Sequence, residues 1–319
     1  MWYISHMPSL IFFDVDPQDQ PRVLQKFPEA KFFPAGLKDQ ALIDVCKGAE
    51  VISTFITTSF PKEVLSQLPD LKLLCTRSVG FDHIDVVYAK EKGIVVTNVP
   101  DYGSHVIAEH AFALLLGTLR HITIGSERVR KGVFDYHGLR GMALRDKTLG
   151  IVGTGKIGKK VAEIAHGFGM RILAQDVYQS AEIVEKFGVK YVERDELFSQ
   201  SDIITLHTPA LPETRHMINA ETIAKMKDGV IIVNTARGSL IDSKALLSAL
   251  NSGKVAYALL DVLEHESSVA EDKELVHHAH VVTTPHIAFY ADDSINTMYD
   301  DCFESIEQWM RGEKPVHTV

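Results

Sequence analysis

The chain has 319 residues, of which 45% are hydrophobic and 24% are charged. This composition supports a buried core in about two domains and excludes the disordered and fibrous classes. Lys and Arg number 33 against 42 Asp and Glu, so the formal net charge is −9. Because this excess of negative charge gives no overall attraction for nucleic acid or anionic lipid, we expect neither as a partner.

Three further features bear on where the protein works. The cysteines, Cys46, Cys75 and Cys302, lie far apart without CxxC spacing, which favours a reducing compartment and gives no thiolate metal site. The most apolar run, residues 111–116, is much shorter than the ~20 residues that a membrane span requires. No Lys or Arg precedes Arg22, so the charged start of a signal peptide is lacking. We therefore expect a soluble cytoplasmic protein.

Short apolar runs alternate with segments of helical period along most of the chain. This pattern is typical of parallel sheets that are covered by helices on both faces. The helix predicted at residues 84–92 ends before Gly93, a residue type that commonly terminates helices. In this first series the predicted strands are residues 10–13, 51–55, 71–75 and 94–97, and a further helix is predicted at 61–68.

A second and longer series follows a predicted helix at residues 108–119 and a charged, glycine-containing stretch at 128–146. It starts with a strand at 149–152, a glycine-rich turn and a helix that is apolar on one face. Residues 292–312 are predicted to form a last amphipathic helix. The other strands predicted in this series are residues 171–175, 203–207, 230–234, 256–261 and 281–284.

The glycine-rich turn has the pattern of a dinucleotide site. Gly153 permits a tight turn, Gly155 lets the backbone approach a pyrophosphate, and Gly158 lets the following helix pack against the sheet. The helix N-terminus then offers unpaired N–H groups to a diphosphate. A plain structural turn is the alternative for this motif taken alone. The same turn contributes the candidate cofactor residues Thr154, Lys156 and Ile157.

Asp176 follows the next predicted strand, eighteen residues after Gly158. A carboxylate at this position accepts hydrogen bonds from the ribose hydroxyls and repels a 2′-phosphate. A solvated acid at a strand end is the alternative. Strand, glycines and spacing together favour the first interpretation, and we expect NAD rather than NADP as the cofactor.

Six ordered segments between residues 77 and 290 carry a family resemblance. They are RSVGFDHID at 77–85, TNVPDY at 97–102, AEHA at 108–111, NTARG at 234–238, DVLEHE at 261–266 and TPHIAFY at 284–290. Together they resemble the D-isomer-specific 2-hydroxyacid dehydrogenases, and among these the D-lactate dehydrogenase branch. An ordered set of this kind is far more specific than a single glycine loop.

The resemblance implies an α/β protein with two doubly wound parallel-sheet domains and a cleft between them. Residues 1–102 and 288–319 would form a flavodoxin-like substrate domain, and residues 103–287 a Rossmann NAD-binding domain. The glycine fingerprint occurs only in the second series, which agrees with that division. The implied activity is NAD-dependent interconversion of a small 2-oxo acid and its D-2-hydroxy acid. The implied assembly is a homodimer, with the apolar helix at 108–119 supplying part of the interface.

The resemblance assigns the catalytic roles to Arg237, Glu266 and His286. The planar guanidinium of Arg237 suits bidentate binding of the substrate carboxylate and can also polarise the keto oxygen. His286 would donate the proton to that oxygen. Glu266 would hold the imidazole and favour its protonated form. Within the resemblance, the spacing from Asp261 selects Glu266 rather than Glu264 as this acid. The periodicity of the sequence alone leaves both residues open.

The resemblance also implies substrate and further cofactor contacts. The backbone N–H groups of Val79 and Gly80 would receive the substrate carboxylate. Tyr102 and Phe289 would line the pocket, with Phe55 as a candidate third wall, although an aromatic residue in such a loop is more often part of a core. The remaining implied cofactor contacts are Thr208, Pro209 and Thr214 near the adenosine, and Thr235, Ala236 and Asp261 beside the nicotinamide.

Other clusters have simpler explanations. The histidines within residues 277–280 lack an acidic or Cys partner at metal-ligand spacing, so we expect no metal site. Packing accounts for His83, His105 and His110, and residues 128–131 are most simply an exposed charged face. Two alternatives stay open for the function. One is another dehydrogenase of the family, of the glyoxylate, hydroxypyruvate, phosphoglycerate or phosphite type; the other is an NAD-sensing, corepressor-like binding protein.

Overall fold

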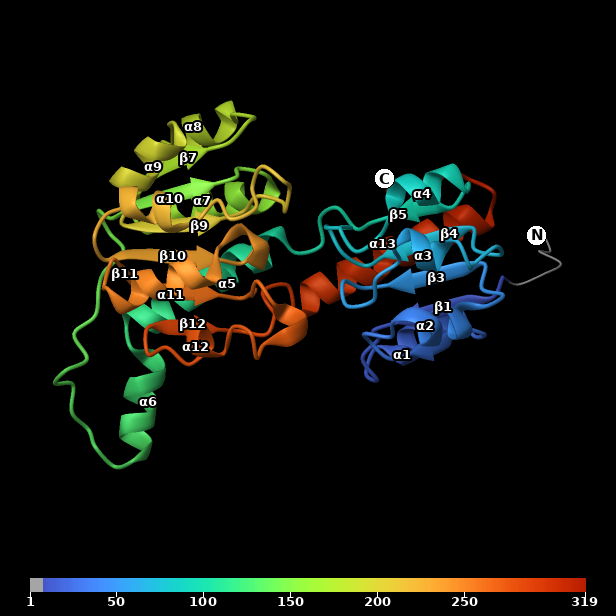
Figure 1. Ribbon diagram of the computed structural model, residues 1–319, viewed down its shortest axis with the longest axis horizontal. Helices are drawn as coiled ribbons and strands as arrows, with labels where there is room; N and C mark the ends of the chain where they lie inside the picture. Colours follow the sequence, from blue (N-terminus) through green and yellow to red (C-terminus); the bar gives the residue numbers. More distant parts are fainter. Residues whose placement is uncertain (1–7) are drawn as a thin grey trace. The chain divides into compact units, whose positions relative to one another are not determined.

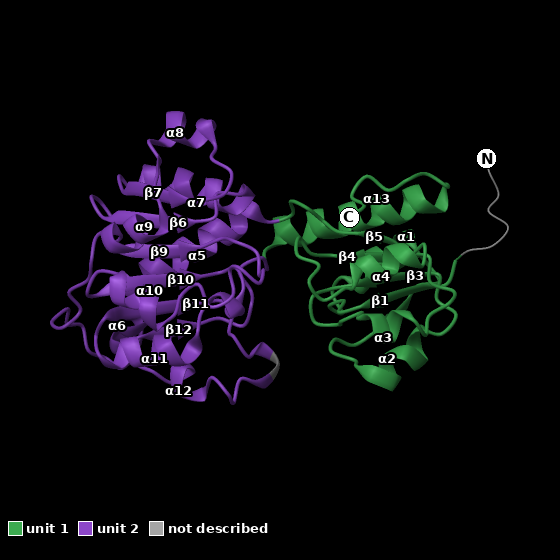
Figure 2. Cartoon of the chain, turned by 45° about the horizontal axis from the view of Figure 1, so that its top comes forward, with its two compact units in different colours: residues 1–102, 291–319 green, residues 103–290 purple. Residues whose placement is uncertain are grey.

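The computed structural model describes residues 8–319, apart from the side chain of Ser267. Residues 1–7, the start of the segment considered as a signal peptide, lie outside this range. The chain forms two compact units (Figure 2): unit 1 contains Met1–Tyr102 and Ala291–Val319, and unit 2 contains Gly103–Tyr290. The chain returns to unit 1 at Ala291, and the Ala288 N–H is bonded to the Asp261 carboxylate within unit 2.

Unit 1 is built on a five-stranded parallel sheet with the order β2-β1-β3-β4-β5 (Figure 1). This is the flavodoxin-like strand order. The strands are β1 (Leu10–Phe13), β2 (Lys31–Phe33), β3 (Val51–Thr54), β4 (Leu73–Thr76) and β5 (Val95–Thr97). The helices are α1 (Gln20–Lys26), α2 (Asp39–Cys46), α3 (Lys62–Leu65), α4 (Val86–Glu91) and α13 (Asp292–Met310).

Helix α13 belongs to unit 1 although it is the last helix of the chain. Its Phe303 packs edge-on against Phe12 of β1, with ring centroids 6.4 Å apart, and against Phe27, at 5.4 Å. Met298, Cys302 and Ile306 are buried on the same helix. The apolar stripe predicted for this segment is therefore the face that closes the core of unit 1.

Unit 2 contains a seven-stranded parallel sheet with the order β12-β11-β10-β9-β6-β7-β8. The direction of the order reverses between β6 and β9, the place where open α/β sheets bind ligands beyond the carboxyl ends of their strands. The strands are β6 (Thr148–Val152), β7 (Arg171–Gln175), β8 (Lys190–Tyr191), β9 (Ile203–Leu206), β10 (Val230–Asn234), β11 (Val255–Leu260) and β12 (Val281–Thr283).

Helices cover both faces of this sheet. One apolar core includes Leu115 of α5 and Val161 of α7 packed with Leu149 of β6, and the other includes Leu246 of α11 packed with Ile232 of β10. The helices are α5 (Ser104–Leu119), α6 (Ile122–Arg130), α7 (Lys156–Gly167), α8 (Ala181–Phe187), α9 (Arg194–Gln200), α10 (Ala220–Lys225), α11 (Ser243–Asn251) and α12 (Lys273–Val276), with short 3₁₀ turns η1 (Gly238–Leu240) and η2 (Glu266–Ser268).

The predicted fold class is confirmed, with local differences. Strands β2 and β8 were not predicted, because they have three and two residues and include the exposed Lys31 and Lys190. Helix α5 starts at Ser104 rather than at residue 108. Arg128 is more than part of an exposed face, since its guanidinium donates to the carbonyl oxygens of Asp135 and His137, at 2.9 and 2.7 Å. Within residues 8–319, no helix has the length and apolar character needed to cross a membrane.

The core of unit 2 generates a stability prediction. Leu149 is fully buried in β6, so Leu149→Ala should lower the free energy of unfolding by roughly 2–5 kcal/mol through lost burial and a new cavity. Leu211→Ala is the matched control, because Leu211 is 49% exposed and its loss should change the free energy by only about 0.5 kcal/mol. Urea unfolding followed by circular dichroism measures both. Equal effects of the two substitutions would contradict the assigned core.

Candidate active site

The glycine turn joins β6 to α7 and has one open position. A Cβ on Gly153, whose φ is +92°, would lie 2.6 Å from the His207 carbonyl oxygen, and one on Gly158 would lie 2.0 Å from the Gly153 carbonyl oxygen. These two glycines are therefore required for close packing. No described atom lies within 4 Å of a Cβ built on Gly155. The backbone at the start of α7 is thus open on this side, as the approach of a pyrophosphate requires.

Asp176 lies just beyond β7 and is bonded to the glycine turn. Its Oδ2 accepts from the Thr154 N–H at 2.5 Å and the Thr154 hydroxyl at 3.0 Å, and its Oδ1 accepts from the Tyr178 N–H at 3.0 Å. Burial raises the pKa of Asp176, but these hydrogen bonds outweigh it, so the pKa lies below its ordinary value. The Tyr191 hydroxyl contacts Thr154 Oγ1 at 2.8 Å and supports the pair. Asp176 is thus an ionised acceptor beside the turn.

The ends of β9 and β10 hold two buried polar atoms that have no hydrogen-bond partner among the described residues. They are Nδ1 of His207 and Oγ1 of Thr235. Burial lowers the pKa of His207 to about 3, so its ring is neutral. Such atoms suit a polar ligand at this edge of the sheet, and together with the open turn they fit a dinucleotide. Sequence reasoning missed His207, whose only signal was its place at the end of a predicted strand, next to Thr208.

The other predicted cofactor residues lie around the same edge. Thr208 and Pro209 follow β9, and the Thr214 hydroxyl donates to the Pro209 carbonyl oxygen at 2.7 Å and so closes that loop. Thr154 is buried and Lys156 is exposed. Ile157 packs against the apolar core, and Ala236 is half-buried beyond β10.

The loop that carries Arg237 is shaped by its neighbours. Asn234, the last residue of β10, accepts from the Ala236 N–H at 3.0 Å and donates to the Arg237 carbonyl oxygen at 2.8 Å. A Cβ on Gly238 would lie 1.8 Å from the Leu263 carbonyl oxygen, so only glycine fits there. The Arg237 side chain is half-buried, and its guanidinium donates to the Ala236 carbonyl oxygen at 2.8 Å.

Asp261, at the end of β11, organises the loop that carries His286. Its buried carboxylate accepts from the Thr284 hydroxyl at 2.5 Å and from the N–H groups of Ile287 and Ala288, at 2.9 and 2.8 Å. Its carbonyl oxygen accepts from the His286 N–H at 2.8 Å. His286 has a φ of +54°, a conformation that non-glycine residues adopt only when their surroundings enforce it.

The structure brings His286 and Glu266 together. Nδ1 of His286 lies 3.2 Å from Glu266 Oε2, and the His286 ring meets that of Phe289 edge-on with centroids 6.4 Å apart. An ionised carboxylate only accepts hydrogen bonds, so this contact assigns the proton to Nδ1 and leaves Nε2 for a substrate. Arg237, Glu266 and His286 follow the adjacent strands β10, β11 and β12, whose carboxyl ends share one edge.

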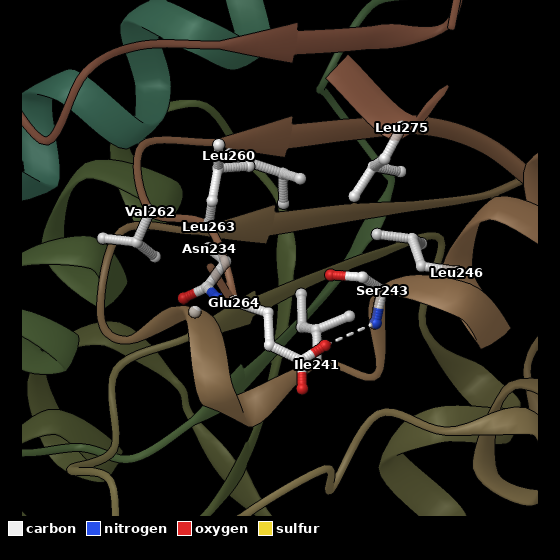
Figure 3. Close-up of a pocket in the computed structure, with 10 residues that line it drawn as sticks. Asn234, Ile241, Ser243, Leu246, Leu260, Val262, Leu263, Glu264 and Leu275 are labelled. Carbon is white, nitrogen blue, oxygen red and sulfur yellow. Dashed lines mark hydrogen bonds between the residues drawn. The ribbon is translucent and has the colours of Figure 1, made fainter. Parts of the chain in front are cut away.

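The Glu264 side chain does not contact His286 and instead accepts hydrogen bonds from residues near the start of α11. It accepts hydrogen bonds from the His216 ring and, at 3.0 Å, from the Ser243 N–H at the start of α11. Figure 3 shows it at a small pocket with apolar walls that include Leu246 and Leu260. Burial raises the pKa of Glu264, but the bonds from Ser243 and His216 outweigh it, and the pKa lies below its ordinary value. Of the two acids, only Glu266 contacts His286.

The predicted substrate residues Val79, Gly80 and Tyr102 belong to unit 1, and Phe289 belongs to unit 2. Among the described residues, the N–H groups of Val79 and Gly80 donate no hydrogen bond. The Val79 carbonyl oxygen accepts from Asn98 at 2.8 Å, and that of Gly80 accepts from Ser78 at 2.6 Å, so the loop after β4 is fixed. Tyr102 is buried, and Phe55 and Phe289 are half-buried.

The histidine cluster near β12 has ring contacts. The His280 ring lies 5.1 Å from that of Tyr257 and 5.6 Å from that of His278. Across the described part of the chain, no group of three or more His, Cys, Asp or Glu side chains is placed to hold a metal ion.

Comparison with known proteins identifies the family. Residues 112–288 match the model of the D-isomer specific 2-hydroxyacid dehydrogenase NAD-binding domain. The chain is 36% identical over 317 residues to D-lactate dehydrogenase of Lactiplantibacillus plantarum, covering 95% of this chain and 93% of that one. It is 40% identical over 275 residues to hydroxypyruvate reductase of Thermotoga maritima, covering 85% and 89%. The chain belongs to the D-isomer specific 2-hydroxyacid dehydrogenase family.

A solved structure of the family agrees along nearly the whole chain. D-lactate dehydrogenase from Aquifex aeolicus, complexed with NAD and lactic acid, matches with a TM-score of 0.86 and 36% identity and covers 96% of both chains. The protein described here is thus an NAD-dependent D-2-hydroxyacid dehydrogenase, and unit 2 contains its NAD-binding domain. The family recognised from the six sequence segments is confirmed, as is the predicted cofactor.

Glu264 generates a pH-dependent prediction. Because folding lowers its pKa, the ionised form stabilises the dehydrogenase fully above pH 4.5, the ordinary value, and this stabilisation is lost as the pH falls through the lowered pKa. Glu264→Gln should therefore lower the free energy of unfolding by roughly 1–3 kcal/mol at neutral pH, and by progressively less in acid. Glu274→Gln, at an exposed position, is the control. If Glu264→Gln lowers the free energy of unfolding by the same amount at acid pH as at neutral pH, the lowered pKa of Glu264 is contradicted.

Proposed function

We propose that this dehydrogenase acts as a D-lactate dehydrogenase-like reductase, converting a small 2-oxo acid to its D-2-hydroxy acid with NADH. The observation that carries the proposal is the contact between Glu266 and Nδ1 of His286, in a loop that Asp261 fixes. This contact leaves Nε2 of His286 available to act as a proton donor. The similarity to a D-lactate dehydrogenase over 95% of the chain supports the choice of substrate class.

Each catalytic group has a task that follows from its chemistry. When bound, NADH supplies the hydride that carbon 2 of the substrate accepts. Arg237 binds the substrate carboxylate and polarises the keto oxygen, since a planar guanidinium offers parallel donors. His286 gives its Nε2 proton to the keto oxygen as that oxygen gains negative charge. Glu266 stabilises the protonated imidazole and holds its orientation.

The substrate contacts belong to the same proposal. The N–H groups of Val79 and Gly80 are suited to donate hydrogen bonds to a substrate carboxylate, because they donate to no described residue. Tyr102, Phe289 and Phe55 are proposed to limit the size of the substrate side chain. One methylene changes discrimination by only about 1–3 kcal/mol, so pyruvate and its near relatives are the first compounds to test. The 40% identity to a hydroxypyruvate reductase makes hydroxypyruvate the second candidate.

On the cofactor side, we propose that Asp176 accepts hydrogen bonds from the adenosine ribose and disfavours a 2′-phosphate. Thr154, Lys156 and Ile157 would border the diphosphate with the three glycines of the turn. Thr208, Pro209 and Thr214 would contact the adenosine half. Thr235, Ala236 and Asp261 would lie beside the nicotinamide, where the unpartnered Thr235 hydroxyl is available as a donor.

The central test replaces the guanidinium. Arg237→Ala should lower kcat/KM for pyruvate roughly 10²- to 10³-fold through loss of carboxylate binding and polarisation, while NADH affinity stays nearly unchanged. Steady-state kinetics at the NADH absorbance, with pyruvate, glyoxylate, hydroxypyruvate and longer 2-oxo acids, measures the effect. Arg194→Ala, an exposed arginine at the start of α9, is the matched control. Unchanged turnover in Arg237→Ala would contradict the proposal.

We also propose a cytoplasmic homodimer. Helix α6 and the loop after it extend from the rest of unit 2 (Figure 1) and expose Ile122 at 61%, Phe134 at 94% and Tyr136 at 79%. Apolar side chains gathered on one extension suit burial against a second copy of the chain. All three cysteines are free, as a reducing compartment such as the cytoplasm would keep them.

The assembly is tested by placing charges on this extension. Phe134→Lys combined with Tyr136→Lys should convert the dimer to a monomer, because two charges would have to be buried in the contact. Analytical ultracentrifugation measures the mass. Val87→Lys, at a position that is 72% exposed in unit 1, should leave the dimer intact. A monomeric parent protein, or a double variant that remains dimeric, would contradict this assembly.

A further inference from the structure

A chain of hydrogen bonds links helix α5 to the loop of His286. Nε2 of His110, on α5, lies 3.1 Å from the Thr284 hydroxyl oxygen, and that hydroxyl lies 2.5 Å from Asp261 Oδ1. The same Nε2 is 3.6 Å from Asp261 Oδ1. The His110 side chain is 19% exposed and that of Asp261 is fully buried. The three side chains therefore form one hydrogen-bond network behind the loop that carries His286.

The direction of these bonds follows from the donors available. Asp261 accepts two backbone N–H groups, from Ile287 and Ala288, which is the behaviour of a carboxylate. Thr284 has a single hydroxyl proton and donates it to Asp261. Nε2 of His110 must then carry a hydrogen and donate it to Thr284 Oγ1. His110 thus supplies the outer donor of a directed relay to Asp261.

This relay ends at the group that holds His286 in place. The Asp261 backbone and side chain together accept the N–H groups of His286, Ile287 and Ala288. Because His286 has a φ of +54°, its backbone depends on this support to keep the conformation. Rotation of the Asp261 carboxyl group would release two of these bonds at once. The Thr284 hydroxyl, which is held by the Nε2–H of His110, opposes that rotation.

We propose that His110 is a positioning residue for the proton donor: its Nε2–H fixes the Thr284 hydroxyl, which fixes the Asp261 carboxylate and the loop that presents His286. The inference deepens the proposed function and rests on it, since it takes His286 as the acid of the reaction. Nothing in the pattern of α5 distinguishes His110 from a packing residue; the contact with Thr284 does.

The test distinguishes the loss of the His110 N–H donor from the loss of the volume of its ring. His110→Leu removes the N–H, whereas His110→Gln replaces it with an amide N–H at similar reach. His110→Leu and Thr284→Val should lower kcat for pyruvate reduction roughly 10- to 100-fold, as small misplacements of catalytic groups do. His110→Gln and Thr284→Ser should recover most of the loss. His105→Leu, at an exposed position of the same helix, is the matched control and should behave like the parent.

Hydrogen exchange of the Ile287 and Ala288 amides, measured by NMR or mass spectrometry, supplies a readout that does not depend on turnover. Both amides should exchange faster in His110→Leu and regain protection in His110→Gln. Exchange and kcat in His110→Leu equal to those of His105→Leu would overturn the relay, and so would a His110→Gln variant as impaired as His110→Leu. Failure of the proposed function appears separately, as full turnover in His286→Gln whatever the exchange result.

Discussion

The candidate active site in unit 2 depends on one buried carboxylate. Burying the charge of Asp261 without partners would cost far more than a single hydrogen bond returns, yet this side chain receives the Thr284 hydroxyl and two backbone N–H groups. Those donors lie on the segment after β12, so the hydrogen bonds to the Asp261 carboxylate also fix the backbone path of that segment. The left-handed conformation of His286 and its contact with Glu266 follow from the same anchoring.

The parallel sheet gathers the remaining groups. Strands β10, β11 and β12 end at one edge, and each is followed by one member of the set Arg237, Glu266 and His286. Asn234 and Gly238 shape the first of these loops, one by hydrogen bonds and the other by the absence of a side chain. The reversal of strand order between β6 and β9 places the open glycine turn beyond the same ends. The residues proposed to bind the cofactor and to act as acid and base thus come from separate loops at one edge of the sheet.

Much of this could be predicted from sequence, for physical reasons. Strands such as β7 and β10 are apolar runs with clear ends, and the glycine positions follow from packing against adjacent backbone. Strands β2 and β8 are too short to produce a pattern. The resemblance selects Glu266 over Glu264, but the physical reason lies in the fold, which turns Glu264 toward His216 and Glu266 toward His286. The partner of His110 is 174 residues away in sequence, which no local pattern reveals.

The proposed function requires that hydride from a bound NADH, assisted by a fixed acid and a guanidinium, reduces a 2-oxo acid on one face only. The most direct measurement is the configuration of the product formed from pyruvate and NADH by the purified protein, determined by chiral chromatography. We expect D-lactate alone, formed in equal amount to the NADH consumed. L-lactate, a mixture of both isomers, or no oxidation of NADH with any 2-oxo acid would contradict it.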